Sequence, residues 1–252
     1  LGPAAVTLLA TQVHPAAGVT TAALCALVGS LWFAAQRSTE PPVVTVALEQ
    51  ASPSRQTAAL ARRSRLAAPG LVVLVPVAVF LGAMFVSVDL STVDFATRFG
   101  HKALAGFILG AYALGSGTGG LWYGSRTWHA PAWRRLAVTL PLTVAGVCTF
   151  WAMPNLLVLT LVIFLCGLTI APTLIAIYSL LESTARPGRA TEAMSWLSTG
   201  VSVGVACGAT AAGFILDAFG ARWGYAFAAA SGVTAALFYL GGLPWVSGRP
   251  RG

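Results

Sequence analysis

Charged residues are scarce in this sequence. Only 9% of its 252 residues are Asp, Glu, Lys or Arg, whereas 57% are hydrophobic, and the mean hydropathy is +0.79. A soluble domain carries about a quarter charged residues. Nine per cent cannot cover the water-facing surface of a folded chain of this length, which excludes an ordinary soluble globular protein. The composition predicts an all-α, polytopic membrane protein that is surrounded by the lipid bilayer. The lipid bilayer is therefore the first partner that the sequence predicts.

Metal-binding and redox motifs are also missing. The three histidines stand far apart in the chain, and no two of the four cysteines form a CxxC pair. No GxxxxGK[ST] loop is present to hold nucleotide phosphates. These absences predict no metal, no cofactor and no direct coupling to ATP. A membrane-embedded enzyme would need paired histidines and acids or an activated nucleophile, so an enzyme is the weaker alternative.

The few charges that are present have a basic excess of +8. A basic balance can indicate a nucleic-acid partner. Here the arginines form short clusters between apolar runs instead of lining one exposed face. This pattern is typical of membrane-flanking charges, so no nucleic-acid partner is expected.

Seven apolar runs are long enough to span a bilayer. An eighth run, over residues 1–13, is too short to do so and is interpreted as a truncated helix, which predicts that the sequence is a piece of a longer protein. The only long polar stretch covers residues 36–68 and is expected to be a cytoplasmic linker. The seven predicted spans are 16–35, 70–94, 103–123, 134–152, 156–181, 194–216 and 223–245.

The basic residues fall unequally on the two sides of these spans. One side receives twelve of the 15 Lys and Arg residues and the other side three, namely Arg98, Lys102 and Arg222. The richer side is cytoplasmic by the positive-inside rule. The sequence therefore predicts a multi-pass cell-membrane protein with the linker and the C-terminus in the cytoplasm.

Two features predict how individual spans behave. Gly200, Gly204 and Gly208 recur at four-residue spacing in an uncharged run, and such a stripe of small residues lets a neighbouring helix approach closely. Pro172 interrupts another apolar run, where it removes one backbone hydrogen bond. A moving helix and a static kink are both compatible with this proline.

The helix that follows the Pro172 span is expected to begin near Thr191. Thr191 is expected to cap that helix before Glu192.

Four strings resemble a known family. GFILGAYALGSGTGGLWYGSRTW, residues 106–128, resembles the eighth helix and following loop of the major facilitator superfamily, with Gly120, Gly124 and Arg126 at the glycine-rich helix end and basic turn. The acidic member of that family motif is absent. AGFILDAFGARWGYAF, residues 212–227, is similar to the eleventh-to-twelfth hairpin of that family. APTLIAIYSLLE and TEAMSWLSTG, residues 171–182 and 191–200, resemble the tenth and eleventh helices of its bacterial drug-type or sugar-efflux-type members.

The resemblance implies a family-type helical bundle with about seven complete transmembrane helices plus a truncated one. Residues 1–35 would be a remnant of the N-terminal bundle, 36–68 the linker and 69–248 the C-terminal six-helix bundle. The implied function is alternating-access transport of a small-molecule substrate, with proton-coupled export across the bacterial inner membrane. The partner would be the missing N-terminal half of the same protein. The alternative is a non-transporting scaffold or the truncated remnant of a permease.

The resemblance also implies that the spans at 70–94 and 156–181 line a central cavity, and these hold the candidate substrate and proton-coupling residues. Asp89 stands first, because an acid within a span is costly unless it faces a cavity or a partner. A shallow position near the helix end is the alternative for Asp89. Thr173 could bind substrate or its own backbone near Pro172. The further candidates are Ser87, Thr92 and Tyr178.

Overall fold

The computed structural model describes residues 16–36, 69–100, 103–185 and 189–247, and this part consists of helices joined by short connections. Residues 1–13 and nearly all of the predicted linker lie outside this description. Within the described ranges, seven helices are long and apolar enough to cross a membrane, which confirms the predicted all-α, polytopic fold. They are α2 (Ala17–Ala35), α4 (Pro69–Arg98), α5 (Leu104–Gly124), α6 (Ala132–Thr149), α7 (Leu156–Thr184), α8 (Ala190–Phe219) and α9 (Ala221–Val246), with a 3-10 turn η2 (Phe150–Ala152) after α6.

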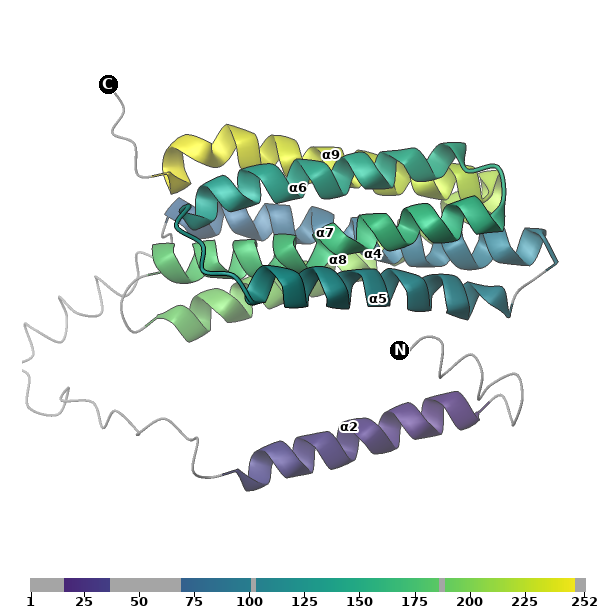
Figure 1. The fold of residues 1–252 in the computed structure, drawn as a ribbon, viewed down its shortest axis with the longest axis horizontal. Helices are drawn as coiled ribbons and strands as arrows, with labels where there is room; N and C mark the ends of the chain where they lie inside the picture. The colour runs from purple at the N-terminus through teal and green to yellow at the C-terminus, as the bar shows by residue number, and fades with distance from the viewer. Residues whose placement is uncertain (1–15, 37–68, 101–102, 186–188, 248–252) are drawn as a thin grey trace, which may run out of the picture.

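The six helices α4 to α9 pack as three layers. Helices α6 and α9 run along one side, α5 and α8 along the opposite side, and α4 and α7 lie between them (Figure 1). The closest pairings are α4 with α8 and α9, and α7 with α5 and α6. The central pair, α4 and α7, therefore makes the closest contacts with both outer layers and supplies about half of the core.

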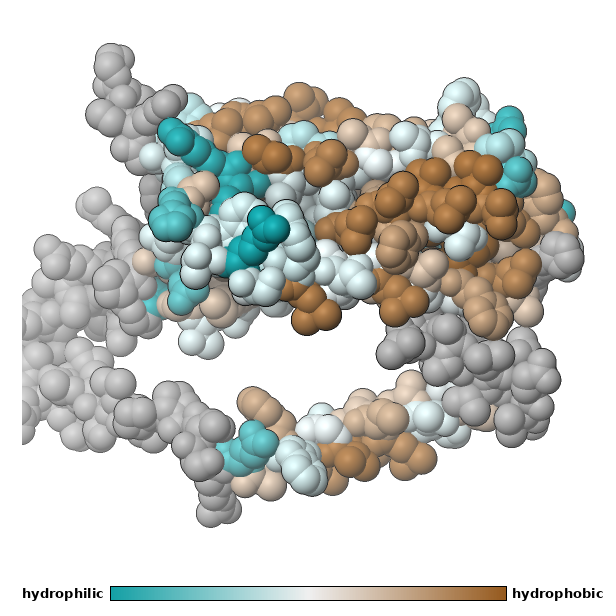
Figure 2. Space-filling view, viewed as in Figure 1, coloured by the Kyte–Doolittle hydropathy of each residue, from teal (hydrophilic) through white to brown (hydrophobic). Residues whose placement is uncertain are grey.

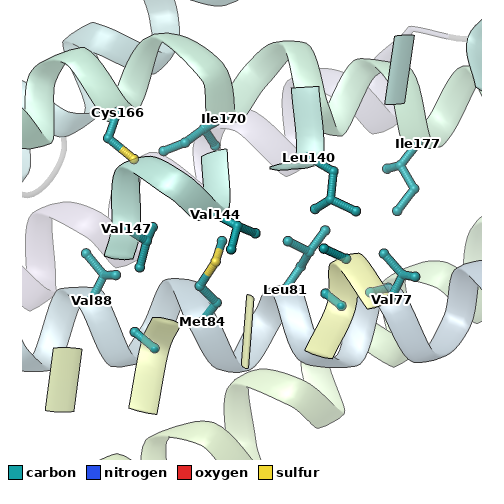
Figure 3. Close-up of a cluster of buried hydrophobic side chains, with 14 of the residues drawn as sticks. Val77, Leu81, Met84, Val88, Leu140, Val144, Val147, Cys166, Ile170 and Ile177 are labelled. Atoms are coloured by element: carbon teal, nitrogen blue, oxygen red, sulfur yellow. The ribbon is translucent and has the colours of Figure 1, made fainter. Parts of the chain in front are cut away.

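The core is built from apolar side chains of α4, α6, α7 and α9. Leu81 and Met84 of α4 face Leu140 and Val144 of α6, with side chains of α7 closing the cluster (Figure 3). Leu81, Met84 and Leu140 are each 1% exposed or less. Because lipid is as apolar as these side chains, tight packing and not exclusion from water holds them together.

Polar groups at the ends of the bundle fix two of its contacts. The Tyr239 hydroxyl of α9 donates to the Trp133 carbonyl at the start of α6 over 2.6 Å. At the other end, the Tyr225 hydroxyl of α9 shares a 3.0 Å hydrogen bond with Thr92 of α4. An unsatisfied polar group is costly in lipid, so these bonds hold α9 at a defined position against α6 and α4.

The predicted cap at Thr191 is wrong. Helix α8 begins at Ala190, so Thr191 lies inside its first turn, and Arg189 is the residue that precedes the helix. Arg189 forms an ion pair with Glu192, with a nitrogen–oxygen distance of 2.6 Å. Glu192 lies in the first turn, where a negative charge also interacts favourably with the helix dipole, so the ion pair starts the helix without a side-chain cap.

Candidate functional site

Asp89 lies on the surface of the six-helix bundle. Helix α4 continues to Arg98, so Asp89 is about 14 Å from the end of the helix and not at its exit. Its side chain is exposed, and no hydrogen bond or ion pair joins it to another described residue. The second acid of α4, Asp94, instead pairs with Arg98 over 2.7 Å. Asp89 is therefore the acid of α4 that has no ionic partner in the described part of the chain.

The face that carries Asp89 is bordered by α5 and α8. Helix α5 packs along α7 and α8 packs along α4, while α4 and α7 touch each other (Figure 1). Three exposed hydroxyls of α8 donate to carbonyls of their own helix, nearer the other end of the α4–α8 contact than Asp89.

Ser87 and Thr92 do not share this exposed position, although they neighbour Asp89 in the sequence. Ser87 is fully buried and donates to the Ala83 carbonyl over 2.6 Å. Thr92 is also fully buried, donates to the Val88 carbonyl over 2.8 Å and bonds Tyr225. The Thr92 hydroxyl thus links α4 to α9, whereas Ser87 bonds only its own helix, and neither hydroxyl is accessible to a solute in this arrangement.

Thr173 belongs to a cluster of hydroxyls between α6 and α7. Thr143 of α6 lies 2.9 Å from the hydroxyls of both Thr169 and Thr173. Thr169 and Thr173 also donate to carbonyls of their own helix, at Cys166 and Thr169 respectively. Backbone bonding and interhelical bonding therefore occur together here, and the cluster joins α6 to α7 beside Pro172.

Replacing Thr143 with valine should lower the free energy of unfolding by about 0.5–1.5 kcal/mol. Valine keeps the shape and removes the interhelical bonds of the Thr143 hydroxyl to Thr169 and Thr173, while Thr169 and Thr173 keep their backbone partners, so no buried group is orphaned. Thermal unfolding in detergent measures the change. Thr210→Val on α8 is the control, because Thr210 is exposed and bonds only its own helix. Equal melting temperatures for the two variants would contradict the role of the cluster.

Tyr178 lies at a different depth from Asp89. Near one end of the bundle, α4 and α7 meet where Gly70 touches Thr184. From that end Asp89 is about 28 Å along α4, whereas Tyr178 is only about 9 Å along α7. Tyr178 is half-buried and packs against the core. The structure therefore does not bring Tyr178 together with Asp89.

Tyr112 of α5 is the neighbour of Asp89 that sequence reasoning missed. It lies about 12 Å from the start of α5, a depth that matches Asp89, and it is within electrostatic range of that carboxyl. Its side chain is 8% exposed, and its buried hydroxyl has no hydrogen-bond partner in the described part of the chain. A single tyrosine in an apolar run does not indicate a functional site, so only the packing of the helices could identify Tyr112 as a candidate.

The glycine stripe of α8 faces α4. A Cβ atom at Gly200 would lie 3.1 Å from the Val75 carbonyl oxygen, and one at Gly204 would overlap the Val79 carbonyl. Gly208 faces Ala83 in the same way. These three positions let the two backbones approach closely enough for weak Cα–H to carbonyl contacts, which recur at helix interfaces.

A second close approach joins α5 to α7 at residues that sequence reasoning did not single out. Cβ atoms at Gly115 and Gly119 would overlap the carbonyls of Phe164 and Leu168. Pro172 has no N–H to donate to Leu168, four residues earlier, so this carbonyl lacks its usual helical partner. Gly119 brings the backbone of α5 against that freed carbonyl. The predicted interruption at Pro172 is thus covered by a neighbouring helix, as membranes require.

The predicted glycines at the end of α5 are more loosely placed. A Cβ atom at Gly120 would lie 3.0 Å from the Ala171 Cβ, whereas one at Gly124 would meet nothing within 4 Å. The Arg126 guanidinium lies 4.5 Å from the centre of the Trp122 ring. Gly120 therefore lies close to α7, while Gly124 and Arg126 belong to the exposed connection to α6.

Together, the seven long apolar helices, the buried interhelical polar bonds and the glycine contacts define the chain as a polytopic helical membrane protein. The sequence profile of the Major Facilitator Superfamily matches residues 77–251, so the chain belongs to that family. Its members are transporters of small solutes and not enzymes, and membrane transport of a small solute is the function that membership assigns. Comparisons with curated proteins and with solved structures found no match.

Proposed function

We propose that this chain forms the C-terminal half of a proton-coupled exporter of the bacterial drug-efflux or sugar-efflux type, which works by alternating access. Residues 69–248 would be one helix bundle, and a second bundle would close over the face that carries Asp89. The observation that carries the proposal is the unpaired Asp89 carboxyl on the open side of an apolar helix.

The physical argument starts from the cost of that carboxylate. An ionised acid costs about 2.5–3.5 kcal/mol at the centre of a membrane helix, and protonation removes the charge. When the face is open to water the carboxylate is stable, and when a second bundle covers the face the neutral acid is favoured. The Tyr112 hydroxyl has no partner in the described part of the chain, so after a rearrangement it would be available to Asp89 or to a bound solute. A proton would thus accompany the conformational change.

The distribution of charge supports a cytoplasmic C-terminus. The α5–α6 connection and the start of α8 carry four described arginines at one end of the bundle, Arg126, Arg134, Arg135 and Arg189. Arg98 and Arg222 lie at the opposite end. The basic end would face the cytoplasm, and the last helix, α9, finishes there.

Helix α2 supports the assignment of residues 1–35 to a separate N-terminal bundle. Gly18 is the one residue of α2 that is buried, and its large apolar side chains are exposed on all sides. Trp32 and Phe33, for example, are 71% and 76% exposed. In a complete transporter, helices of the N-terminal half and lipid would cover this surface.

Asp89→Asn in the complete protein tests the coupling. Asparagine is isosteric and cannot ionise, so transport driven by a pH gradient should fall at least about tenfold, which corresponds to about 1.4 kcal/mol. Exchange of solute without a gradient should change less than about twofold, because exchange needs no net proton movement. Inside-out membrane vesicles can be screened for both activities with ethidium and a panel of radiolabelled sugars.

Asp94→Asn is the matched control, because Asp94 already has an ionic partner on its own helix. It should leave both activities near the wild-type level, since exposed ion pairs contribute little. A substituted Asp89 that still supports the full pH-driven flux would remove this residue from the mechanism.

A further inference from the structure

A lateral groove opens between α5 and α6. The two helices each pack along α7 but barely touch each other, which leaves a cavity of about 760 Å³ with α7 as its floor. This volume is within the range of about 300–1,000 Å³ that is usual for small-molecule sites. We call it the α5–α6 groove. The lining residues that bear on its chemistry are Trp122, Arg134, Arg135, Val138, Thr139 and Leu142.

One part of the groove is apolar and faces outward from the bundle. Trp122, Val138 and Leu142 are 53%, 66% and 57% exposed, so no described helix covers them. On the adjacent surface of α7, Leu161 and Leu165 continue the apolar surface away from the basic end, each 60% exposed. A surface of this kind in a membrane-spanning segment is in contact with lipid tails.

The other part of the groove lies beside two arginines. Arg134 and Arg135 line it, and no Asp or Glu is among its lining residues. Figure 2 shows hydrophilic side chains gathered at this end of the bundle, with hydrophobic side chains over most of the remaining face. The groove therefore joins a positive charge at the membrane surface to an apolar path into the bilayer.

Two buried polar atoms in the groove have no partner in the described part of the chain. These are the Nε of Arg135 and the Oγ1 of Thr139. One terminal nitrogen of Arg135 donates to the Tyr123 hydroxyl over 3.0 Å, which fixes the guanidinium in position. The Trp128 indole donates to the Tyr123 carbonyl over 2.8 Å and stacks on that ring, which holds the connection at the mouth. Buried polar atoms without partners indicate an acceptor that is not part of the chain.

From this geometry we infer that the α5–α6 groove binds an anionic phospholipid of the leaflet at the basic end. The phosphate would accept hydrogen bonds from Arg134, Arg135 and Thr139, because guanidinium groups bind phosphate with a matching fork of donors. The acyl chains would follow Val138, Leu142 and Leu165 into the bilayer. Basic pockets between membrane helices bind anionic headgroups in this manner.

Native mass spectrometry of the purified complete protein tests the inference. Phosphatidylglycerol should bind at least about tenfold more tightly than phosphatidylcholine with the same acyl chains, because one good charge-assisted contact accounts for this ratio. The double variant Arg134→Gln, Arg135→Gln should lose this preference. Arg222→Gln, an exposed arginine at the other end of the bundle, should keep it. Equal binding of the two lipids by the wild-type protein would overturn the inference.

A single-residue variant and a competition experiment test the lipid site further. If the double variant does not fold, Arg134→Gln alone is measured, because Arg134 is exposed, and it should weaken phosphatidylglycerol binding about threefold. An unchanged affinity would count against the inference. Glycerol phosphate, the headgroup without acyl chains, should not compete at millimolar concentration. Effective competition would overturn the lipid assignment and point to a water-soluble anion instead.

Discussion

Replacing Gly204 with leucine is expected to prevent the six-helix bundle from forming. Gly204 faces the Val79 carbonyl of α4 so closely that even a Cβ atom would overlap it. The contact is with backbone, which cannot turn aside as a side chain can. A leucine would therefore push α8 away from α4 and remove the close packing on which helix association in lipid depends. The loss should exceed about 3 kcal/mol, the upper part of the range for overpacked cores.

Gly213→Leu on the same helix is the matched control. A Cβ atom at Gly213 would meet nothing within 4 Å, so leucine there should be tolerated and should raise the helix propensity. Size-exclusion chromatography and thermal unfolding in detergent separate the two variants. The predicted result is a monodisperse Gly213 variant and an aggregated Gly204 variant. Similar profiles for both would show that the α4–α8 contact does not hold the bundle together.

Gly220→Ala is expected to destabilise the hairpin between α8 and α9. Gly220 has a φ of 85° and ψ of −178°, a conformation that costs other residues about 1–3 kcal/mol. Its N–H donates to the Leu216 carbonyl over 2.9 Å, and its own carbonyl accepts from Trp223 over 3.0 Å. One residue thus ends α8 and starts α9. An added methyl group would also lie 2.8 Å from the guanidinium carbon of Arg98.

Gly100→Ala separates backbone strain from steric overlap. Gly100 also has a positive φ, of 76°, but a Cβ atom there would meet nothing within 4 Å. Thermal unfolding should therefore show a clear loss of stability for Gly100→Ala and a larger loss for Gly220→Ala. If the two substitutions lowered the melting temperature equally, the Arg98 contact would contribute nothing at Gly220.

The sequence predicted the membrane helices well because each depends on a local quantity. A run of about 20 apolar residues must form its own backbone hydrogen bonds in lipid, whatever its neighbours are. The ends were less predictable. Helix α8 begins at Ala190, four residues before the predicted start, because the Arg189–Glu192 ion pair stabilises a first turn that is polar. Threonine is a residue type that often caps helices, but in the structure Thr191 lies within the first turn of α8 and does not cap it.

The candidate site was only partly predictable for a related reason. Asp89 could be singled out, because an acid in an apolar run is unusual wherever it faces. The sequence could not show that Ser87 and Thr92 are buried while Asp89 is exposed. The burial of Thr92, for example, depends on Tyr225, which is more than 100 residues away in the sequence. Tyr112 carried no signal at all. Whether it is a packing residue or a neighbour of Asp89 depends on where α5 meets α4.

By itself, the sequence determined the class of this protein, its helices and the basic bias of one side, because hydropathy and charge act on each segment independently. The tertiary structure alone decided which faces are paired. Gly204 meets α4, Gly119 covers the carbonyl freed by Pro172, Thr173 bonds α6, and Asp89 stays uncovered. In lipid the apolar residues have no preference for the inside, so backbone proximity and the partners of a few polar groups decide how the helices fit together.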